Sequence, residues 1–505
     1  MIFRLNIRVI ILALLIFSVG SVIADQLSIR SMVVGKKALE LSENRQITFG
    51  PERVIAAAIS PDGKRVAYIS EKENTKSLCI ARTNGTSATA VITSAYYPTA
   101  EDRPAEGETW NFDPLIAWSN QIAWSPDSKH IAIPATKTTW NPTSNTEQSC
   151  MLILASNGAY EATLMPPQSY SKVQSPLFSP NSNKLATVAI SPPQELKEYA
   201  VVVYDVPQSS GQVIYSIYSP HYIPIKFDKW DSDEQSMRAR VYEKNSYQYK
   251  RILLNGQASE LISEVDNFYT ISPNDKLRVL REKPGIVVEN ISTGDATTVV
   301  TVGFLSYRSW IPNNRMLLCG RAEKIYDKSN NRIRLLHTLW LANVESTKMN
   351  TMCVALDYDG EAPTWSTDCT RMAYTCNERL YIAELNWREP TNVEKVAAGI
   401  ATEEEEKAVL LADAKQIEIG LEQYLSDHQN MLPDANAIEQ IRLYVSDDAV
   451  YKPGTDQMIF KYISPGLLKQ SEIKNQSDTI IGELDLGRSW KVVFYADMQA
   501  NVVNK

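Results

Sequence analysis

The sequence predicts a mainly β protein, in which a β-propeller is followed by a small α+β domain at the C-terminus. Two observations predict this fold. A short motif of strand, tight turn and strand recurs along residues 40–395, and after Pro390 it gives way to a helical periodicity. The chain has 505 residues, of which 44% are hydrophobic and 22% charged. This length and composition indicate a soluble globular protein with at least two domains.

The repeated motif is an apolar strand, a turn built on Pro with Asp, Asn, Gly or Ser after it, and a second alternating strand. The clearest copies are ISPDGKRVAY at 59–68, WSPDSKHIA at 124–132 and FSPNSNKLA at 178–186. Pro suits the first central position of a tight turn, and the small polar residues suit the next ones. Each copy therefore predicts an antiparallel hairpin. Weaker copies occupy 271–279, 310–316, 365–374 and 230–235.

A third strand follows most of the hairpins, and a more polar fourth segment precedes the next copy. The third strands are expected at 78–82, 151–155, 201–205, 286–290, 339–343 and 380–385. Four short antiparallel strands that recur every roughly 40 to 65 residues are typical of propeller blades. The seven turns favour seven blades, with six as the alternative.

The Ser-Pro-Asp-Gly turn, flanked by an aromatic residue and by a Lys or Arg, apolar, Ala, apolar pattern, resembles the repeat of TolB-like propellers, a family of WD-like β-propellers. The resemblance covers residues 40–395. It implies a propeller that binds protein partners, as in the TolB envelope protein, or a non-catalytic propeller like those of prolyl-oligopeptidase-type enzymes. TolB-like propellers often have six blades. Residues 45–50 resemble an outermost strand that closes the ring against the last blade and so covers a sheet edge.

The N-terminus predicts export. Residues 1–24 carry Arg4 and Arg8, an apolar run at 9–19 and short side chains before Ala24, which is the layout of a cleaved secretory signal. An uncleaved anchor is the alternative, but a spanning helix needs about 20 apolar residues. We expect a periplasmic or extracellular protein with no membrane span in the mature chain.

Charge and cysteine content restrict the partners and the covalent structure. The net charge of −8 becomes −10 without the signal, with 49 basic (51 − 2) against 59 acidic residues, so nucleic acid is excluded as a partner. The six cysteines allow 15 complete pairings. Cys369 and Cys376 are expected at opposite ends of one extended segment, beyond disulfide reach. The other pairings stay open, and buried core thiols are favoured.

The predicted binding face is the one that carries the long insertions. Because strand direction alternates, the tight turns share one face of the propeller, and insertions at 94–113, 137–149, 191–199 and 321–334 are expected on the other. Long loops on a rigid scaffold commonly hold binding residues. Aromatic and Arg side chains suit a surface that recognises protein, with carbohydrate as the alternative ligand. The candidate partner-binding residues are Tyr96, Tyr97, Arg103, Trp110, Phe112 and Trp140. Alternatively, these side chains pack on one another and hold the long loops closed.

The C-terminal residues 398–505 predict a separate α+β domain. Thr402 and Glu405 form a capping-box pattern, and apolar residues recur at spacings of three and four from Leu410 to His428. A second short helix is expected at 435–444. Strands are expected at 458–463, 479–484 and 490–496.

The segments 414–417, 421–428, 431–433 and 490–497 resemble the soluble part of pilin-like and type II secretion pseudopilin-like proteins. The hydrophobic half-helix that anchors a pilin is absent, and Asp497 is followed by Met498 and Gln499 in place of Gly-His. The resemblance therefore implies a recruited interaction domain and not a filament subunit.

The sequence predicts no catalytic residue, metal ligand or cofactor. No histidine has a His or Cys neighbour at metal-ligand spacing, and no Gly-x-Ser-x-Gly elbow occurs. Residues 357–361 lack the ligands of a calcium loop. The leading hypothesis is an exported, non-catalytic binding or scaffold protein at the cell envelope. The alternative is a propeller enzyme, a glycoside hydrolase or lyase, with carboxylates gathered around the axis. The four histidines are His130, His221, His337 and His428.

Overall fold

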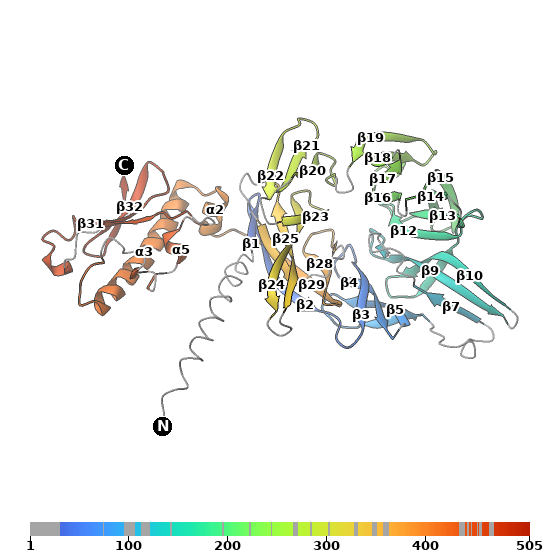
Figure 1. Cartoon of the computed structure of the whole chain (residues 1–505), viewed down its shortest axis with the longest axis horizontal. Coiled ribbons are helices and arrows are strands. Elements are labelled where there is room, and N and C mark those ends of the chain that lie inside the picture. Colours follow the sequence, from blue (N-terminus) through green and yellow to red (C-terminus); the bar gives the residue numbers. More distant parts are fainter. Residues whose placement is uncertain are drawn as a thin grey trace, which may run out of the picture. The chain divides into compact units, whose positions relative to one another are not determined.

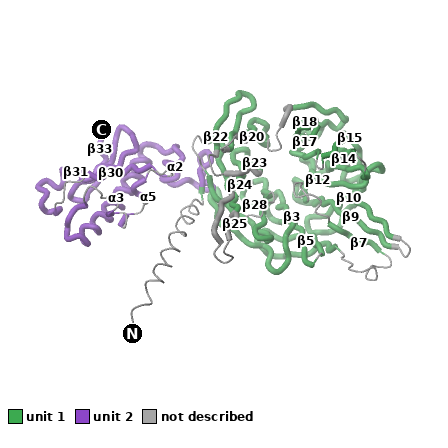
Figure 2. The backbone as a smooth tube through the Cα atoms, viewed as in Figure 1, with its two compact units in different colours: residues 1–31, 40–387 green, residues 32–39, 388–505 purple. Residues whose placement is uncertain are grey.

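The computed structural model divides the chain into two compact units, which are described separately (Figure 2). The first unit is built from residues 40–387, and the second joins residues 32–39 to 388–505. The structure describes residues 31–73, 75–94, 107–112, 122–141, 144–193, 196–221, 224–243, 245–265, 271–282, 285–300, 304–327, 332–345, 351–356, 363–433, 440–441, 444–445, 447–451, 453, 457–463 and 469–505. The signal sequence expected at 1–24 lies outside these residues.

Within the described residues, the strands up to β29 form seven antiparallel sheets, the blades, which follow one another around a ring (Figure 1). Blade 1 contains β3 (Arg53–Ile59), β4 (Arg65–Lys72), β5 (Thr75–Arg82) and β6 (Thr89–Thr93). Blade 2 contains β7 (Gly107–Asn111), β8 (Ala123–Trp124), β9 (His130–Asn141), β10 (Ser144–Ala155) and β11 (Tyr160–Leu164). Blade 3 contains β12 (Lys172–Phe178), β13 (Lys184–Ile190), β14 (Lys197–Asp205) and β15 (Ser210–Ser219).

Blade 4 contains β16 (Ile225–Trp230), β17 (Ser236–Glu243), β18 (Ser246–Leu253) and β19 (Ala258–Val265). Blade 5 contains β20 (Leu277–Glu282), β21 (Gly285–Asn290) and β22 (Ala296–Val300), with a bridge from Ile271 to Arg278 in place of a first strand. Blade 6 contains β23 (Phe304–Trp310), β24 (Met316–Asp327), β25 (Arg332–Asn343) and β26 (Thr351–Leu356). Blade 7 contains β27 (Thr364–Trp365), β28 (Arg371–Cys376), β29 (Arg379–Arg388), β2 (Lys37–Gln46) and β1 (Ser31–Val34). The predicted mainly β propeller, with the favoured seven blades, is confirmed.

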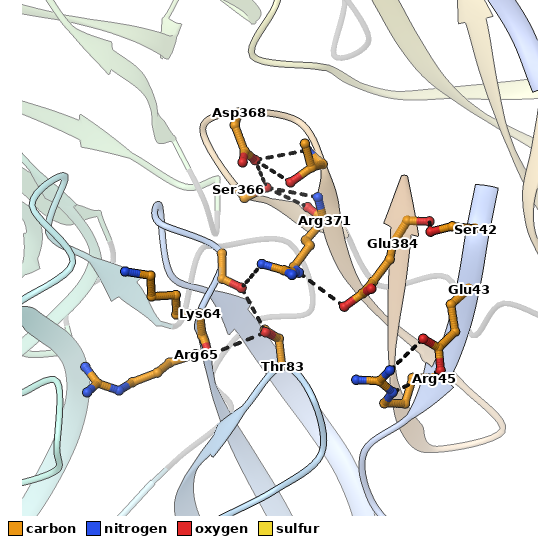
Figure 3. A network of polar contacts seen from close by, with 12 residues as sticks. Ser42, Glu43, Arg45, Lys64, Arg65, Thr83, Ser366, Asp368, Arg371 and Glu384 are labelled. Carbon is orange, nitrogen blue, oxygen red and sulfur yellow. Dashed lines mark hydrogen bonds and ion pairs between the residues drawn. The ribbon is translucent and has the colours of Figure 1, made fainter. Parts of the chain in front are cut away.

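The ring is closed by a strand that precedes blade 1 in the sequence. β2 pairs with β29 as an outer strand of blade 7. Of the residues 45–50 expected to form such a strand, only Arg45 and Gln46 belong to β2, which begins at Lys37. Beyond β2, the amide of Ile47 donates to the Leu380 carbonyl (2.8 Å). Beside the tight turns of blades 1 and 7, the Arg371 guanidinium donates to the Gly63 carbonyl of blade 1 (3.2 Å) and to Glu384 of blade 7 (3.3 Å), as Figure 3 shows. Residues far apart in the sequence therefore close the circle.

The Ser and Asp of the motif build each tight turn by hydrogen bonding to the backbone. In blade 1, the Ser60 hydroxyl donates to Asp62 (2.6 Å) and accepts from the Arg65 amide (3.0 Å). The Asp62 carboxylate accepts from the Lys64 amide (3.1 Å). The next position has a positive φ, +68° at Gly63, where glycine is unstrained. The corresponding residues of the other turns, also with positive φ, are Ser128, Ser182, Glu234, Asp275, Asn314 and Cys369.

Polar residues at three of these positive-φ positions link blades 2, 3 and 4 to the blade before them. The Asp62 amide donates to the Ser128 hydroxyl (3.0 Å), and the Asn181 amide donates to Glu234 (2.5 Å). The Asp127 amide reaches Ser182 (3.4 Å) in the same way. This bonding explains why a polar side chain often replaces glycine there, since it accepts a backbone N–H that would otherwise lack a partner.

Most neighbouring blades are joined by hydrophobic clusters. Such clusters connect blades 1 and 2, 2 and 3, 3 and 4, 5 and 6, and 7 and 1. The alanine of the motif lies in the cluster shared with the following blade and is at most 1% exposed in four copies. A larger side chain there would hold the sheets apart. These alanines are Ala67, Ala132, Ala186 and Ala373.

The second unit packs a long helix on a four-stranded sheet. Its helices are α2 (Asn392–Ala398), α3 (Glu403–Asp427), α5 (Asp447–Val450) and the 3₁₀ turn η1 (Gln470–Glu472). Its strands are β30 (Phe460–Tyr462), β31 (Ile480–Leu484), β32 (Trp490–Tyr495) and β33 (Ala500–Asn504), in that order. The Thr402 and Glu405 capping box is present, and the apolar stripe of α3 lies in one core with Trp490. α2 and β33 were not predicted, and most of the helix expected at 435–444 lies outside the described residues.

Candidate functional site

Two of the insertions expected as loops are regular β-ribbons. Residues 137–149 continue β9 and β10, and residues 321–334 continue β24 and β25, so that each of these four strands has 12 residues. β8 pairs with the near part of β9, and β7 pairs with its far part on the same side. Tyr96, Tyr97 and Arg103 lie outside the described residues.

The strand register places the two candidate tryptophans on opposite faces of the blade 2 ribbon. Trp110 stands opposite Lys137, whereas Trp140 stands opposite Gly107. Directly opposed residues share a face, and successive residues along a strand change face. Lys137 and Trp140 are three positions apart, so Trp110 and Trp140 point to opposite sides. The prediction that these aromatic residues form one surface is therefore wrong for this pair.

The surroundings of the candidate residues differ accordingly. Phe112 is 1% exposed in the core between blades 1 and 2, so the prediction that it contacts a partner is wrong. Trp110 packs against the same core. Trp140 is half-buried, and its indole N–H donates to the Thr109 hydroxyl (3.0 Å). Phe112 and Trp110 thus anchor the ribbon in the core, as the alternative interpretation held, whereas Trp140 lies on the opposite face of the ribbon.

Blade 4 departs from the repeat on the face turned away from blade 3. Arg238 stands where four other blades have the buried alanine, since both positions follow the same turn on the second strand. The alternate residues Met237, Ala239 and Val241 pack into the cluster with blade 3. The opposite side, which we call the cationic face of blade 4, therefore turns toward blade 5. Its residues are Lys226, Lys229, Arg238, Arg240, Tyr242, Tyr247, Tyr249 and Arg251.

At the turn end of the cationic face, carboxylates balance the cations. Asp231 is 9% exposed and accepts from the Nε atoms of Arg238 and Arg251, both at 2.8 Å. Burial alone would raise the pKa of Asp231, but the Ser236 hydrogen bond and the two guanidinium groups outweigh it and hold the pKa below its ordinary value. Asp275 of the blade 5 turn pairs with Arg238 (2.5 Å) and Lys229 (2.8 Å). These ion pairs join blade 4 to blade 5.

The hypothesis that Asp231 and Asp233 belong to a degenerate blade turn is confirmed. The Glu234 amide donates to the Asp231 carbonyl (3.0 Å), as the Gly63 amide does to the Ser60 carbonyl (2.8 Å) in blade 1. Asp231 takes the place of the motif serine. Its carboxylate accepts from the side chains of Arg238 and Arg251, whereas the motif serine Ser60 accepts from the backbone amide of Arg65.

At the other end of the cationic face, two cations lie among aromatic rings. Lys226 stands directly opposite Arg240 in the register, and its ammonium lies 5.3 Å from the centre of the Tyr247 ring. The His221 and Tyr242 rings stack at 4.4 Å, and Tyr242 meets Tyr247 edge to face at 5.2 Å. Burial and the charge of Arg240 lower the pKa of Lys226. We call these five residues the Lys226–Arg240 site.

The sequence did contain a signal for this site. In 237–242 the order is Met, Arg, Ala, Arg, Val, Tyr, so that the positions facing the next blade carry cations where the motif has Ala and an apolar residue. The signal was missed because the turn at 230–235 is too degenerate to set the register without the structure.

The groups considered for metal or redox chemistry have structural surroundings. His130 Nδ1 lies 2.6 Å from Glu161, and His428 stacks on Tyr424. All six cysteines are buried and unbridged. In the part of the chain that the structure describes, no three His, Cys, Asp or Glu side chains gather as a metal site, and no helix is long and apolar enough to cross a membrane. Residues 357–361 lie outside the described residues.

The arrangement of sheets defines the chain as a β-propeller protein with a C-terminal α+β unit. Similar solved structures include oligogalacturonate lyase from Vibrio parahaemolyticus (10% identity, 70% of this chain and 98% of that one, TM-score 0.44). They also include TolB from Acinetobacter baumannii (15%, 65% and 66%, 0.32) and an acylaminoacyl peptidase from Pyrococcus horikoshii (12%, 67% and 51%, 0.41). No protein-family model and no curated protein sequence matches the chain. The fold assignment rests on the seven sheets of this chain itself.

Proposed function

We propose that the chain is an exported, non-catalytic binding protein that makes protein contacts at the cell envelope. One observation carries the proposal: β9 and β10 extend as a ribbon with 12 residues in each strand, whereas β12 and β13 of the next blade have seven. A ribbon held by a closed ring presents side chains at little entropic cost, which favours binding.

The proposal includes the organisation expected from the sequence. A signal at 1–24 directs export to the periplasm or beyond, the propeller occupies 25–395, and the pilin-like domain at 398–505 offers a second contact surface. Carbohydrate is the alternative ligand of the ribbon.

The carboxylates in the tight turns of blades 4 and 5 favour a binding protein over the enzyme alternative. Asp231 and Asp275 are both held by Arg238, and the pKa of Asp231 is lowered. A carboxylate that stays ionised in an ion pair suits a structural link and does not suit a general acid.

Affinity capture from envelope extract tests the proposal. The baits are residues 25–505 unchanged, with Trp140→Ala, and with Trp110→Ala as the matched control. Trp140→Ala should reduce capture of the partner at least tenfold while the melting temperature is kept. Trp110→Ala should act through stability, since Trp110 packs on the core. A partner bound equally by both variants would move recognition away from the ribbon, and capture of none would contradict the proposed function.

A further inference from the structure

We propose that Glu198, flanked by Tyr170 and Tyr218, binds a lysine side chain from a basic segment of a protein partner. We call these three residues the Glu198 site. The inference rests on the proposed function and names the chemistry of the partner. It concerns blade 3 and not the ribbon of blade 2.

Three segments bring the Glu198 site together at one end of blade 3. Glu198 and Tyr218 are directly opposed on β14 and β15, so they share a face of the sheet. Val202 and Tyr204, on the same face of β14, pack into the cluster with blade 2, and Tyr170 packs against that cluster. β12 leads into the tight turn of blade 3, and Tyr170 precedes β12. The site therefore lies at the end away from the turns, on the side of the propeller that carries the ribbons.

The half-buried Glu198 carboxylate accepts hydrogen bonds from two phenols. The Tyr170 hydroxyl donates to Oε1 (3.1 Å), and the Tyr218 hydroxyl donates to Oε2 (3.4 Å). Burial and the neighbouring carboxylate raise the pKa of Tyr170 to about 12, so this phenol stays protonated and remains a donor. Among the residues that the structure describes, no Lys, Arg or His forms an ion pair with Glu198. The negative charge is therefore held by neutral groups.

The lysines nearest to the site in the sequence point to the other face of blade 3. Lys197 precedes Glu198 on β14, and successive residues of a strand change face. Lys172 pairs with Ile190, which packs against the cluster with blade 4, whereas the next residue, Val173, packs toward blade 2. Neither lysine therefore lies on the face of the sheet that carries Glu198.

Several other partly buried glutamates of the blades do pair with a cation of their own sheet. These pairs are Glu289 with Arg278 (2.8 Å), Glu384 with Arg371 (3.3 Å) and Glu243 with Lys250 (2.6 Å). The pair at Glu243 also includes a phenol, since the Tyr215 hydroxyl donates to Glu243 (2.5 Å). The Lys250 ammonium lies 5.8 Å from the centre of the Tyr215 ring. The chain itself thus shows how a glutamate and a tyrosine of a blade hold an ammonium group.

The chemistry of the Glu198 site selects an ammonium group as its ligand. Both phenol O–H groups already donate to the carboxylate, so what the site offers is acceptor oxygens and a negative charge. An ammonium group donates three hydrogen bonds, accepts none and is attracted to an aromatic ring. Tyr218 is 66% exposed and supplies such a ring beside the carboxylate. On a chain with net charge −8, a basic partner is also attracted over a longer distance.

Fluorescence anisotropy with a fluorescein-labelled peptide of eight lysines tests the inference on the chain 25–505. Glu198→Gln keeps the length of the side chain and an acceptor for the phenols but removes the charge. It should weaken binding about fivefold or more and leave the melting temperature unchanged. The matched control, Glu260→Gln, removes the same charge from the exposed outer strand of blade 4 and should change binding less than about twofold.

The inference is overturned if the unchanged chain does not bind the lysine peptide, or if Glu198→Gln affects binding no more than Glu260→Gln does. It is also overturned as to the ligand if a neutral hexasaccharide of glucose binds through Glu198 and the peptide does not. The proposed function is judged separately by capture from envelope extract. Capture that ignores Glu198→Gln sinks only this inference, and peptide binding through Glu198 without any captured protein sinks only the proposed function.

Discussion

The Arg238 guanidinium of blade 4 lies 2.5 Å from the Asp275 carboxylate in the blade 5 turn. Among the described residues, the joins between blades 1 and 2, 2 and 3, and 3 and 4 are hydrophobic clusters that carry the buried alanine of the motif. Here an arginine takes the place of that alanine and an ion pair takes the place of the cluster. The join between blades 4 and 5 should therefore respond to charge and salt in a way that the other joins do not.

Replacing Asp275 with Asn should destabilise the propeller by about 1 kcal/mol, because Arg238 and Lys229 lose their shared carboxylate in a partly exposed position. Urea unfolding at low and high salt measures the loss, which should shrink as salt rises. Asp233→Asn is the matched control, since Asp233 is 55% exposed and lies 3.8 Å from Arg251. Equal losses in both variants would refute the special role of this join.

Asp231 should make stability depend on pH in acid. Its pKa is lowered in the folded chain, so its contribution is present above its unfolded pKa, about 3.9, and is lost as pH falls through the folded value. The free energy of unfolding of Asp231→Asn should therefore lie below that of the unchanged chain at pH 7 and approach it as the pH falls through the folded pKa of Asp231. A constant difference across this range would show that Asp231 contributes no charge-dependent stability.

The link between turns predicts an ordered series at Ser128. Its hydroxyl accepts the Asp62 amide, and its φ is +60°. Ser128→Ala loses the hydrogen-bond acceptor, and the free energy of unfolding should fall by about 1 kcal/mol. Ser128→Gly relieves the backbone strain at positive φ but also lacks the acceptor. Ser128→Asn keeps an acceptor and tolerates positive φ, so it should be the most stable of the three by thermal melting. If Ser128→Gly has the highest melting temperature of the three, the backbone conformation and not the hydrogen bond determines stability at this position.

The position of the motif alanine should tolerate a larger side chain in blade 4 but not in blade 3. Ala186 is fully buried between blades 3 and 4, so Ala186→Leu should cost about 1 to 3 kcal/mol through overpacking. Arg238→Leu places the same side chain at the corresponding position of blade 4, where space for a long side chain exists already. Its cost should come from the loss of the Arg238 contacts to Asp231 and Asp275 and should be smaller in high salt. Denaturant unfolding of the two variants separates steric from electrostatic loss.

The propeller could be predicted because its turns are local: Ser60, Pro61 and Asp62 build a hairpin within a few residues, and the same chemistry recurs. The ribbons were not predicted, because residues 136–139 are polar throughout and lack the apolar alternation of the other strands, although Thr favours strands. Their pairing with β7 and β10 establishes the strand. Which face Trp110 and Trp140 occupy depends on pairing across about 30 residues of chain, which composition does not encode.

The cationic face shows a second limit of the same kind. Arg238 and Arg240 were visible as alternate residues, but their direction depends on where the blade 4 turn ends. Asp231 obscures that point because it replaces the motif serine. The sequence alone therefore did not show that Arg238 and Arg240 occupy the positions where the motif has Ala and an apolar residue, facing the next blade.

The second unit should need the segment that precedes the propeller. Residues 32–39 belong to it together with 388–505, and Met32, Val33, Val34 and Leu39 are at most 5% exposed. A chain of 379–505 alone should therefore unfold at lower urea than the same chain with 29–46 joined by a flexible linker, because the linked chain keeps both β2 and its partner strand β29. Changing Val34 to Asp in the linked chain should reduce the gain, and Lys36→Asp, at an exposed turn position, should not. If 379–505 alone is as stable as the linked chain, the segment does not stabilise the unit.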